Sequence, residues 1–224
     1  MTDAHRVWLI IGTSHGIGLE LVRQLAASPA NTVIATCRSP TSATTLHELA
    51  ASVMGTVHIV ALDTDDRQSV QASVAEVVSV LGDSGIDYLI NNVGFNPGGY
   101  DKAFTMELDN MVRVFTTNVV GSAHVAQTYL PLVAKSTGKT IVNVSSTLGS
   151  MGSERPGGEL YASYSISKAG LNMLADAEFH SDGGGENAKL EVSVGVAGIL
   201  RAIMPLTPAD SGKFFRHSGE EVPW

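Results

Sequence analysis

The stretch that decides the fold is I-G-T-S-H-G-I-G, residues 11–18. An apolar run at 7–11, V-W-L-I-I, leads into it, and an amphipathic pattern follows it. Gly12, Gly16 and Gly18 therefore stand where a strand turns tightly into a helix, and side chains there would obstruct a pyrophosphate or the helix–sheet contact. The free N–H groups at the start of that helix also favour an anion. The stretch predicts a turn that binds dinucleotide phosphates; the alternative is a glycine-rich turn without a ligand.

Short apolar runs alternate with helical patterns along the chain. Runs rich in β-branched residues are typical of strands, whereas apolar residues spaced by three and four indicate helices. This alternation predicts right-handed βαβ units and an open, doubly wound parallel α/β sheet, Rossmann-like, in a single domain over residues 1–224. The helix pattern at 103–135 is long enough for two helices, divided near Thr117–Val119. Strands are expected at 7–11, 32–37, 57–62, 87–92 and 140–145, and helices at 17–28, 41–52, 66–81 and 103–135.

Composition and charge exclude several classes of protein. A hydrophobic content of 44% with 16% charged residues is typical of a globular chain, not of a disordered one. The net charge of −8 argues against a nucleic-acid-binding surface and a polybasic membrane anchor. The sequence has neither a signal peptide pattern nor an apolar run of about 18 residues, so no membrane partner is expected. Cys37 is the only cysteine, which fits a reducing compartment, so we expect a cytoplasmic protein. The histidines are scattered without the spacing of metal ligands, so we expect no metal site.

The end of the second expected strand bears on the choice of cofactor. An acidic residue there would bind ribose hydroxyls and repel a 2′-phosphate, but this chain has Cys37 followed by Arg38. A guanidinium suits a phosphate, and His15 in the first turn could add a second positive group. The hypothesis is that NADPH is preferred over NADH. The alternative is that Arg38 is a plain surface charge.

A possible acid–base pair lies in Y-A-S-Y-S-I-S-K-A-G, residues 161–170. Lys168 follows Tyr164 by four residues, so a helix would place both on one face, whereas Tyr161 has Ser165 at that offset. A tyrosine with a pKa near 10 is a poor proton donor or acceptor at neutral pH unless a nearby positive charge favours its anion. The spacing alone also occurs on solvated helix faces, so other motifs must decide its meaning.

Taken together, the motifs resemble the short-chain dehydrogenase/reductase family. The first turn, L-D at 62–63, N-N-V-G at 91–94, Asn118, V-N-V-S-S at 142–146 and Y-S-I-S-K at 164–168 occur in the family's order. The ending, L-T-P-A-D-S-G-K-F-F with G-E-E-V-P-W, is similar to that of the C-factor/sniffer-like carbonyl reductases within this family. The resemblance implies a Rossmann-like fold and hydride transfer between a nicotinamide and a small or medium carbonyl or alcohol substrate.

The resemblance also implies catalytic roles. Tyr164 would be the general acid that protonates the carbonyl oxygen, and Lys168 would lower the pKa of that tyrosine and hold the nicotinamide ribose. Ser146 would hydrogen-bond the substrate oxygen, and Asn118 would help to hold a water in a proton relay. Ser145 would be a structural neighbour. The alternatives are that Ser146 only caps its own backbone and that Asn118 only forms hydrogen bonds at a helix boundary.

The same resemblance gives a cofactor-binding set. Asp63 would contact the adenine, with a helix N-cap as its other reading, and Asn91 and Gly94 would line the cofactor channel. Family members pair through their long helices into dimers or tetramers, or stay monomeric, and the sequence leaves a homodimer or homotetramer open. The full set of expected cofactor contacts is Gly12, Ser14, His15, Gly16, Ile17, Gly18, Arg38, Asp63, Asn91, Gly94, Tyr164 and Lys168.

The chain departs from the family pattern in three places. Ile11 stands where the family has threonine, and the segment between Ser146 and Tyr164 is long enough for an inserted loop over the substrate cleft. After the catalytic helix no P-G turn follows a clear strand. Either Val192, Val194 and Val196 form an alternating sixth strand, or 190–204 is an amphipathic helix. The resemblance of the chain's ending to the sniffer-like reductases favours the helix. In that case the sixth strand would be absent, and the last strand, near 213–216, would be displaced or detached.

Two functions remain open at this stage. The first is an NADPH-dependent carbonyl reductase or alcohol dehydrogenase, favoured by the intact Ser146, Tyr164 and Lys168. The second is an NADP(H)-binding protein of little or no turnover, a scaffold or redox sensor, favoured by the truncated segment after Phe179. Non-redox chemistry on the same residues is less favoured because the cofactor turn is complete. The segments 95–100 and 149–160 are expected to line the cleft, but they identify no substrate.

Overall fold

The structure is a computed structural model that describes residues 5–98, 100–153, 161–174, 177–180 and 191–224. The chain divides into two compact units, residues 1–92 with 124–141 and residues 93–123 with 142–224. Both are built from parallel strands and helices, and the chain has the doubly wound α/β architecture that the sequence predicts. The assignment of 1–224 to a single domain stays a prediction.

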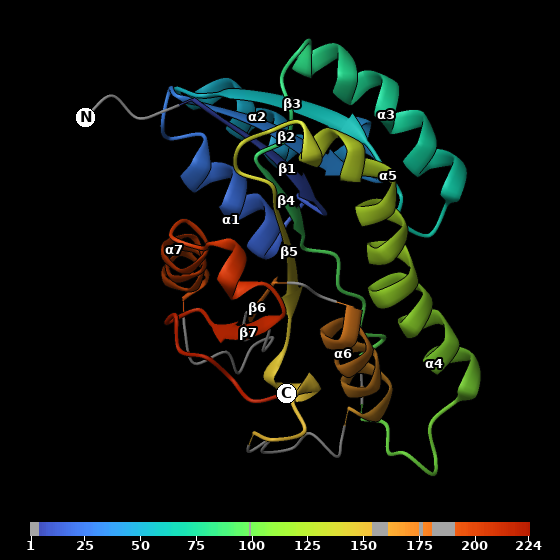
Figure 1. The fold of residues 1–224 in the computed structure, drawn as a ribbon. Helices are drawn as coiled ribbons and strands as arrows, with labels where there is room; N and C mark the ends of the chain where they lie inside the picture. Colours follow the sequence, from blue (N-terminus) through green and yellow to red (C-terminus); the bar gives the residue numbers. More distant parts are fainter. Residues whose placement is uncertain (1–4, 99, 154–160, 175–176, 181–190) are drawn as a thin grey trace. The chain divides into compact units, whose positions relative to one another are not determined.

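The first unit carries the amino-terminal half of the sheet. Its strands are β1 (Arg6–Ile11), β2 (Asn31–Cys37), β3 (Thr56–Ala61) and β4 (Tyr88–Asn91), in the order β3-β2-β1-β4. The helices are α1 (Gly16–Leu25), α2 (Thr44–Ser52), α3 (Arg67–Leu81) and most of α5 (Ser122–Ala134), with a short 3₁₀ turn η1 (Pro40–Ser42). α1 lies on one face of the strands, and α3 and α5 lie on the other (Figure 1).

The order of these strands fixes the position of a ligand site. The chain winds outward from β1 to β3 and then returns to place β4 on the other side of β1, and all pairings are parallel. Ligands of open α/β sheets bind beyond the carboxyl ends of the strands at such a reversal. In this unit we therefore expect a ligand site at the residues that follow β1, β2 and β4.

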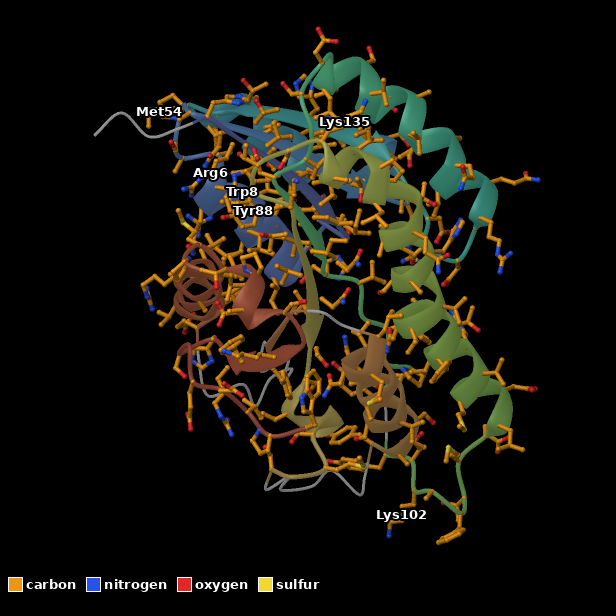
Figure 2. The ribbon with its side chains drawn as sticks, viewed as in Figure 1. Arg6, Trp8, Met54, Tyr88, Lys102 and Lys135 are labelled. Atoms are coloured by element: carbon orange, nitrogen blue, oxygen red, sulfur yellow. The ribbon has the colours of Figure 1, made fainter. Side chains whose placement is uncertain are left out.

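The core of the first unit explains why these runs form central strands. Leu9, Ile10 and Ile34 are fully buried, as expected for parallel strands that are covered by helices on both faces. At the sheet's amino end the Trp8 ring stacks on Tyr88, with centroids 4.1 Å apart and planes 11° apart (Figure 2). An aromatic pair of this kind adds about 0.5–1.5 kcal/mol beyond area burial.

The second unit contains the other half of the predicted pattern. It holds α4 (Leu108–Phe115), a π-helical turn η2 (Thr116–Gly121), most of β5 (Thr140–Ser145), a 3₁₀ turn η3 (Thr147–Gly149) and α6 (Ala162–Leu174). It continues with β6 (Ala177–His180), α7 (Val192–Ile203), a 3₁₀ turn η5 (Pro208–Asp210) and β7 (Lys213–Arg216). β5, β6 and β7 pair in parallel in this order.

The structure answers the question of the sixth strand. Val192, Val194 and Val196 lie in α7, so the helix interpretation is confirmed and the strand interpretation is wrong. The sheet does not lack a sixth strand, because β6, the element that follows α6, pairs with both β5 and β7. β7 is thus neither detached nor moved next to β5. A short segment at 177–180 satisfies the strand edges that a deletion would have left unpaired.

The remaining expected elements agree with the structure to within a few residues. The one qualitative difference is at Thr117–Val119, where the helix does not break but widens into the π-helical turn η2. No helix of the described segments is long and apolar enough to cross a membrane. Within the same segments, no group of His, Cys, Asp and Glu residues is placed to hold a metal ion.

Candidate active site

The turn after β1 is built on its glycines. Gly12 and Gly16 have φ angles of +82° and +57°, in the left-handed region that favours glycine. Gly18 has a different reason: a Cβ there would lie 2.0 Å from the carbonyl oxygen of Gly12 and 2.6 Å from the Nδ2 atom of Asn92. Asn92 Nδ2 itself donates to the Gly12 oxygen at 2.9 Å. The glycine spacing thus brings the helix against the turn, as the sequence predicts.

The amino end of α1 is left open to an anion. His15 is the N-cap residue, but its side chain makes no capping hydrogen bond; its Nδ1 atom pairs instead with Ser14 Oγ at 2.9 Å. Gly16, Ile17 and Gly18 form the first turn, which contains no acidic residue. Backbone N–H groups at such a helix start, together with the helix dipole, suit a phosphate.

A polar pocket of about 260 Å³ lies beyond the end of β2. Ser14, Cys37 and Arg38 line it together with hydroxyl groups from η1 and the start of α2: Ser39, Ser42, Thr44 and Thr45. Burial raises the pKa of the Cys37 thiol, so this residue contributes a neutral wall and Arg38 contributes the positive charge. The glycine turn, the open helix start and this pocket fit a dinucleotide.

Two other expected cofactor residues lie in the same unit. Asn91 is the last residue of β4 and is buried. Asp63 follows β3 and accepts a hydrogen bond from the amide of Asp65 at 3.1 Å, in a turn of its own. The N-cap of α3 is Asp66, whose side chain accepts from the amide of Gln68, so the N-cap reading of Asp63 is wrong. The carboxylate of Asp63 is half-buried at the end of the strand.

In the second unit Tyr164 and Ser146 form a pair. Tyr164 lies in the first turn of α6 and Ser146 directly follows β5. Burial raises the pKa of Tyr164 to about 12, and a side-chain hydrogen bond with Ser146 opposes this rise. Tyr161, in contrast, lies before the helix. Its backbone forms an isolated β-bridge with Asp101, and its ring packs on Tyr100 with ring centroids 5.6 Å apart. Of the two tyrosines, Tyr164 is therefore the one that lies in α6 and pairs with Ser146.

Lys168 is one helical turn further along α6 and is 2% exposed. Its Nζ atom donates to the carbonyl oxygen of Val144 at 2.7 Å and lies 5.7 Å from the centroid of the Tyr164 ring. A Cβ on Gly94 would lie 3.7 Å from the same Nζ atom, so Gly94 borders the lysine without crowding it. The sequence correctly places Lys168 beside Tyr164.

Asn118 lies in the π-helical turn η2, fully buried. Its Oδ1 atom accepts from the amide of Phe95 at 2.6 Å, and its Nδ2 atom donates to the carbonyl oxygen of Phe95 at 3.0 Å. Nδ2 also donates to Ser167 Oγ at 2.9 Å, and that hydroxyl donates to the carbonyl oxygen of Tyr164 at 2.7 Å. The side chain of Asn118 therefore ties the loop after β4 to the helix that carries Tyr164. π-turns of this kind recur at functional sites.

The structure adds two residues that sequence reasoning missed. Ser167 links Asn118 to the backbone of Tyr164, and Asn92 closes the phosphate turn onto Gly12. Both stand within quoted motifs, but nothing in their residue type indicates these partners. Ser145 is the structural neighbour that was expected, because its hydroxyl bonds Asn172 Oδ1 and the carbonyl oxygen of Lys168. Most of the expected inserted loop, 154–160, and residue 99 of the segment 95–100 lie outside the described residues.

Comparison with known proteins identifies the family. The model of the short chain dehydrogenase family matches residues 6–196, which is most of the chain. The chain is a short-chain dehydrogenase. It belongs to a family of oxidoreductases, and the phosphate turn, Ser146, Tyr164 and Lys168 all fall within the matched residues.

Relatives of this short-chain dehydrogenase agree in sequence and structure. An uncharacterized oxidoreductase of Schizosaccharomyces pombe is 29% identical over an alignment of 259 residues that covers all of both chains. Because this alignment is longer than the 224 residues of the present chain, the relative has residues that this chain lacks. An NADPH-bound carbonyl reductase from chicken fatty liver is 31% identical with a TM-score of 0.89, covering 99% of this chain and 95% of that one. The carbonyl reductase Sniffer of D. melanogaster is 26% identical with a TM-score of 0.88, covering 99% and 100%.

Proposed function

We propose that this chain is an NADPH-dependent carbonyl reductase that acts on a small or medium aldehyde or ketone, with Tyr164 as its general acid. The observation that carries the proposal is the hydrogen-bonded pair of Ser146 and Tyr164, set beside the buried ammonium of Lys168. Two hydroxyl groups of this kind suit a carbonyl oxygen that gains negative charge during reduction. The fit of the first unit to a dinucleotide and the likeness to carbonyl reductases support it.

The side chains have distinct tasks in this proposal. NADPH, when bound, supplies the hydride that reduces the carbonyl carbon. Tyr164 donates its phenolic proton to the carbonyl oxygen, and Ser146 donates a hydrogen bond to the same oxygen as charge develops. With a pKa of about 12, Tyr164 keeps its proton at neutral pH and is a weak acid by itself, so it needs a nearby positive charge to release that proton. Lys168, 5.7 Å from the ring, offsets the charge left on the tyrosine after proton transfer.

Arg38 is proposed to select NADPH over NADH. It is exposed at the rim of the polar pocket beyond β2, where Ser39 and Ser42 add hydroxyl donors to its guanidinium. A planar guanidinium and neighbouring hydroxyls recognise a phosphate monoester better than they recognise two ribose hydroxyls. The absence of an acidic side chain among the residues lining the pocket removes the group that would repel a 2′-phosphate.

The proposal is tested by NADPH consumption with a panel of aldehydes, ketones and quinones. Turnover by the wild-type chain, with a loss of about 100-fold or more in Tyr164→Phe and a smaller loss in Ser146→Ala, is the expected result. Tyr161→Phe is the matched control, because it also removes a phenolic hydroxyl, three residues before Tyr164. The ring of Tyr161 packs on Tyr100. Turnover that is unchanged in Tyr164→Phe would reject the acid role.

A second function is supported by one specific observation. Lys168 Nζ donates to the carbonyl oxygen of Val144 and lies 5.7 Å from the centroid of the Tyr164 ring, and the pKa of Tyr164 is raised. This arrangement is compatible with a protein that binds NADP(H) but has little turnover, a scaffold or redox sensor. Tight NADPH binding by calorimetry, with no consumption across the whole panel, would favour this function over the reductase.

A further inference from the structure

Beyond β7 the chain folds back on itself as a short hairpin. Gly219 has a φ angle of +84°, and its amide donates to the carbonyl oxygen of Arg216 at 2.8 Å, so it forms the turn. The amide of Val222 donates to the carbonyl oxygen of Phe214 at 2.6 Å, and both side chains are buried. The Trp224 ring stacks on Phe214 with centroids 5.8 Å apart. These contacts hold residues 220–224, the tail, against β7.

The tail is also bonded to the segment that follows η3. The hydroxyl of Ser150, which is fully buried, donates to the carbonyl oxygen of Pro223. The amide of Gly152 donates to the carbonyl oxygen of Trp224 at 2.8 Å. A Cβ on Gly152 would lie 3.0 Å from the Pro223 side chain, so the two segments are in close contact. The Ser150 hydroxyl also pairs with Ser153 Oγ at 2.9 Å, so it links this segment to the tail through Pro223.

The segment that the tail holds is the one that carries Ser146. The amide of Gly149 donates to the carbonyl oxygen of Ser146 at 2.8 Å, and the amide of Ser150 donates to the carbonyl oxygen of Thr147 at 3.0 Å. This turn also packs against the catalytic helix, since a Cβ on Gly149 would lie 2.6 Å from the carbonyl carbon of Lys168. Ser146 and Ser150 are thus the two ends of one hydrogen-bonded turn on α6.

We propose that Ser150 and the tail are positioning elements: by fixing the far end of the η3 turn, they hold the hydroxyl of Ser146 toward Tyr164. The inference rests on the proposed function, because it assigns to the tail a part in the reaction of that same pair. A turn of five residues with one end released gains backbone freedom, and a misplaced catalytic hydroxyl costs rate more than it costs binding. Ser150 touches no reacting atom and acts only through Ser146.

The test compares Ser150→Ala and a chain that ends at Val222 with the wild-type protein. Both variants keep Val222, the buried anchor of the hairpin. We expect kcat to fall about tenfold in each while the KM for NADPH stays within about twofold, since the pocket beyond β2 is not altered. The pH at which alcohol oxidation rises is expected to move upward, because Ser146 lowers the pKa of Tyr164. Ser218→Ala, an exposed serine in the same hairpin, is the control.

Hydrogen exchange on the protein without substrate separates this inference from the proposed function. Removing Pro223 and Trp224 is expected to speed amide exchange at Gly149 and Ser150, whose own hydrogen bonds lie within the turn, as well as at Gly152. Unchanged exchange at Gly149 and Ser150 would overturn the proposal, and so would an unchanged kcat in both variants when Ser146→Ala is impaired. If the wild-type chain shows no turnover, the proposed function fails and the exchange result alone decides the inference.

Discussion

The ammonium group of Lys168 donates a hydrogen bond to the carbonyl oxygen of Val144, at 2.7 Å, from a side chain that is 2% exposed. Burying a charge is costly unless hydrogen bonds compensate for the lost water. The buried lysine therefore needs its hydrogen bond to the carbonyl oxygen of Val144. Its position beside Tyr164 and Gly94 gives it a chemical reason to be there.

The first prediction separates these two roles of Lys168. Lys168→Met keeps the length of the side chain but removes the charge and takes a donor from the buried carbonyl oxygen of Val144, so we expect the free energy of unfolding to fall by about 1–3 kcal/mol. Carbonyl reduction should fall about 100-fold or more. Urea unfolding and NADPH-consumption assays measure the two effects. Lys135→Met, at an exposed lysine (Figure 2), is the control; a Lys168→Met protein that fails to fold would contradict the prediction.

The raised pKa of Tyr164 predicts a loss of stability in alkali. The native pKa is about 12 against an ordinary value of 10, so above pH 10 the unfolded chain releases this proton while the native protein retains it. The stability due to this residue is complete below pH 10 and is lost as the pH rises toward 12, by about 1.4 kcal/mol at pH 11. Tyr164→Phe should therefore lose less stability between pH 9 and pH 11 than the wild type.

Urea midpoints at the two pH values measure this difference, with Tyr161→Phe as the control. Burial also raises the pKa of Tyr129, but that contribution is the same in all three proteins and cancels in the comparison. An equal alkaline loss in the wild type and in Tyr164→Phe would show that the phenol of Tyr164 is not buried as described.

The phosphate turn gives a prediction on backbone packing. In Gly18→Ala the new Cβ would meet the Gly12 carbonyl oxygen at 2.0 Å, so helix and turn must separate. We expect a loss of about 1–3 kcal/mol in the free energy of unfolding, typical of overpacking, and an NADPH Kd that rises more than tenfold. Gly82→Ala is the control: its φ of +57° and ψ of −121° cost an alanine about 1–3 kcal/mol, but no atom crowds the new Cβ, so the NADPH Kd should not change. Fluorescence titration with NADPH distinguishes the two variants.

Local sequence signals were sufficient for most of the fold. The phosphate turn and the first five strands could be predicted because β-branched runs, helical spacing and glycines act over a few residues. The strand at 177–180 could not, because whether so short a run forms a strand depends on the open edges of β5 and β7, which only the assembled sheet provides. Thr117–Val119 marked a real irregularity, but its π-helical form depends on where the Asn118 side chain bonds.

The candidate site shows the same division. The identities of Ser146, Tyr164 and Lys168 followed from the motifs, and the structure places them together in one unit. The partners did not follow: Val144 accepts from Lys168 through its backbone, and a carbonyl oxygen leaves no trace in a residue type. Ser167 was also not recognisable, because its hydroxyl bonds Asn118, which is 49 residues away in the sequence.

Arg38 provides a prediction on cofactor choice. Replacing it by alanine removes the guanidinium from the pocket beyond β2, so the NADPH Kd should rise by about 10- to 100-fold, the usual worth of a charge-assisted phosphate contact. The NADH Kd should stay within about twofold, because NADH lacks the 2′-phosphate. Calorimetry with both cofactors measures the ratio, and Arg67→Ala at the exposed start of α3 is the control. Equal losses for NADPH and NADH would contradict a role in phosphate recognition.

The hydrogen bond from Asn118 Nδ2 to Ser167 Oγ predicts energetic coupling between the π-turn and the catalytic helix. Both side chains are fully buried, and Ser167 passes the contact on to the carbonyl oxygen of Tyr164. In a double-mutant cycle of Asn118→Ala and Ser167→Ala, each single change should cost about 1–3 kcal/mol in the free energy of unfolding, because it leaves a buried polar group without this partner. The double variant should cost less than the sum of the two single changes, with a coupling of about 1 kcal/mol.

Urea unfolding measures all four proteins, and kcat should fall in the variants because Tyr164 is held less firmly. The pair of Asn118→Ala with Ser218→Ala, a distant exposed serine, should be additive; additivity of Asn118→Ala with Ser167→Ala would show that the contact does not couple the two elements.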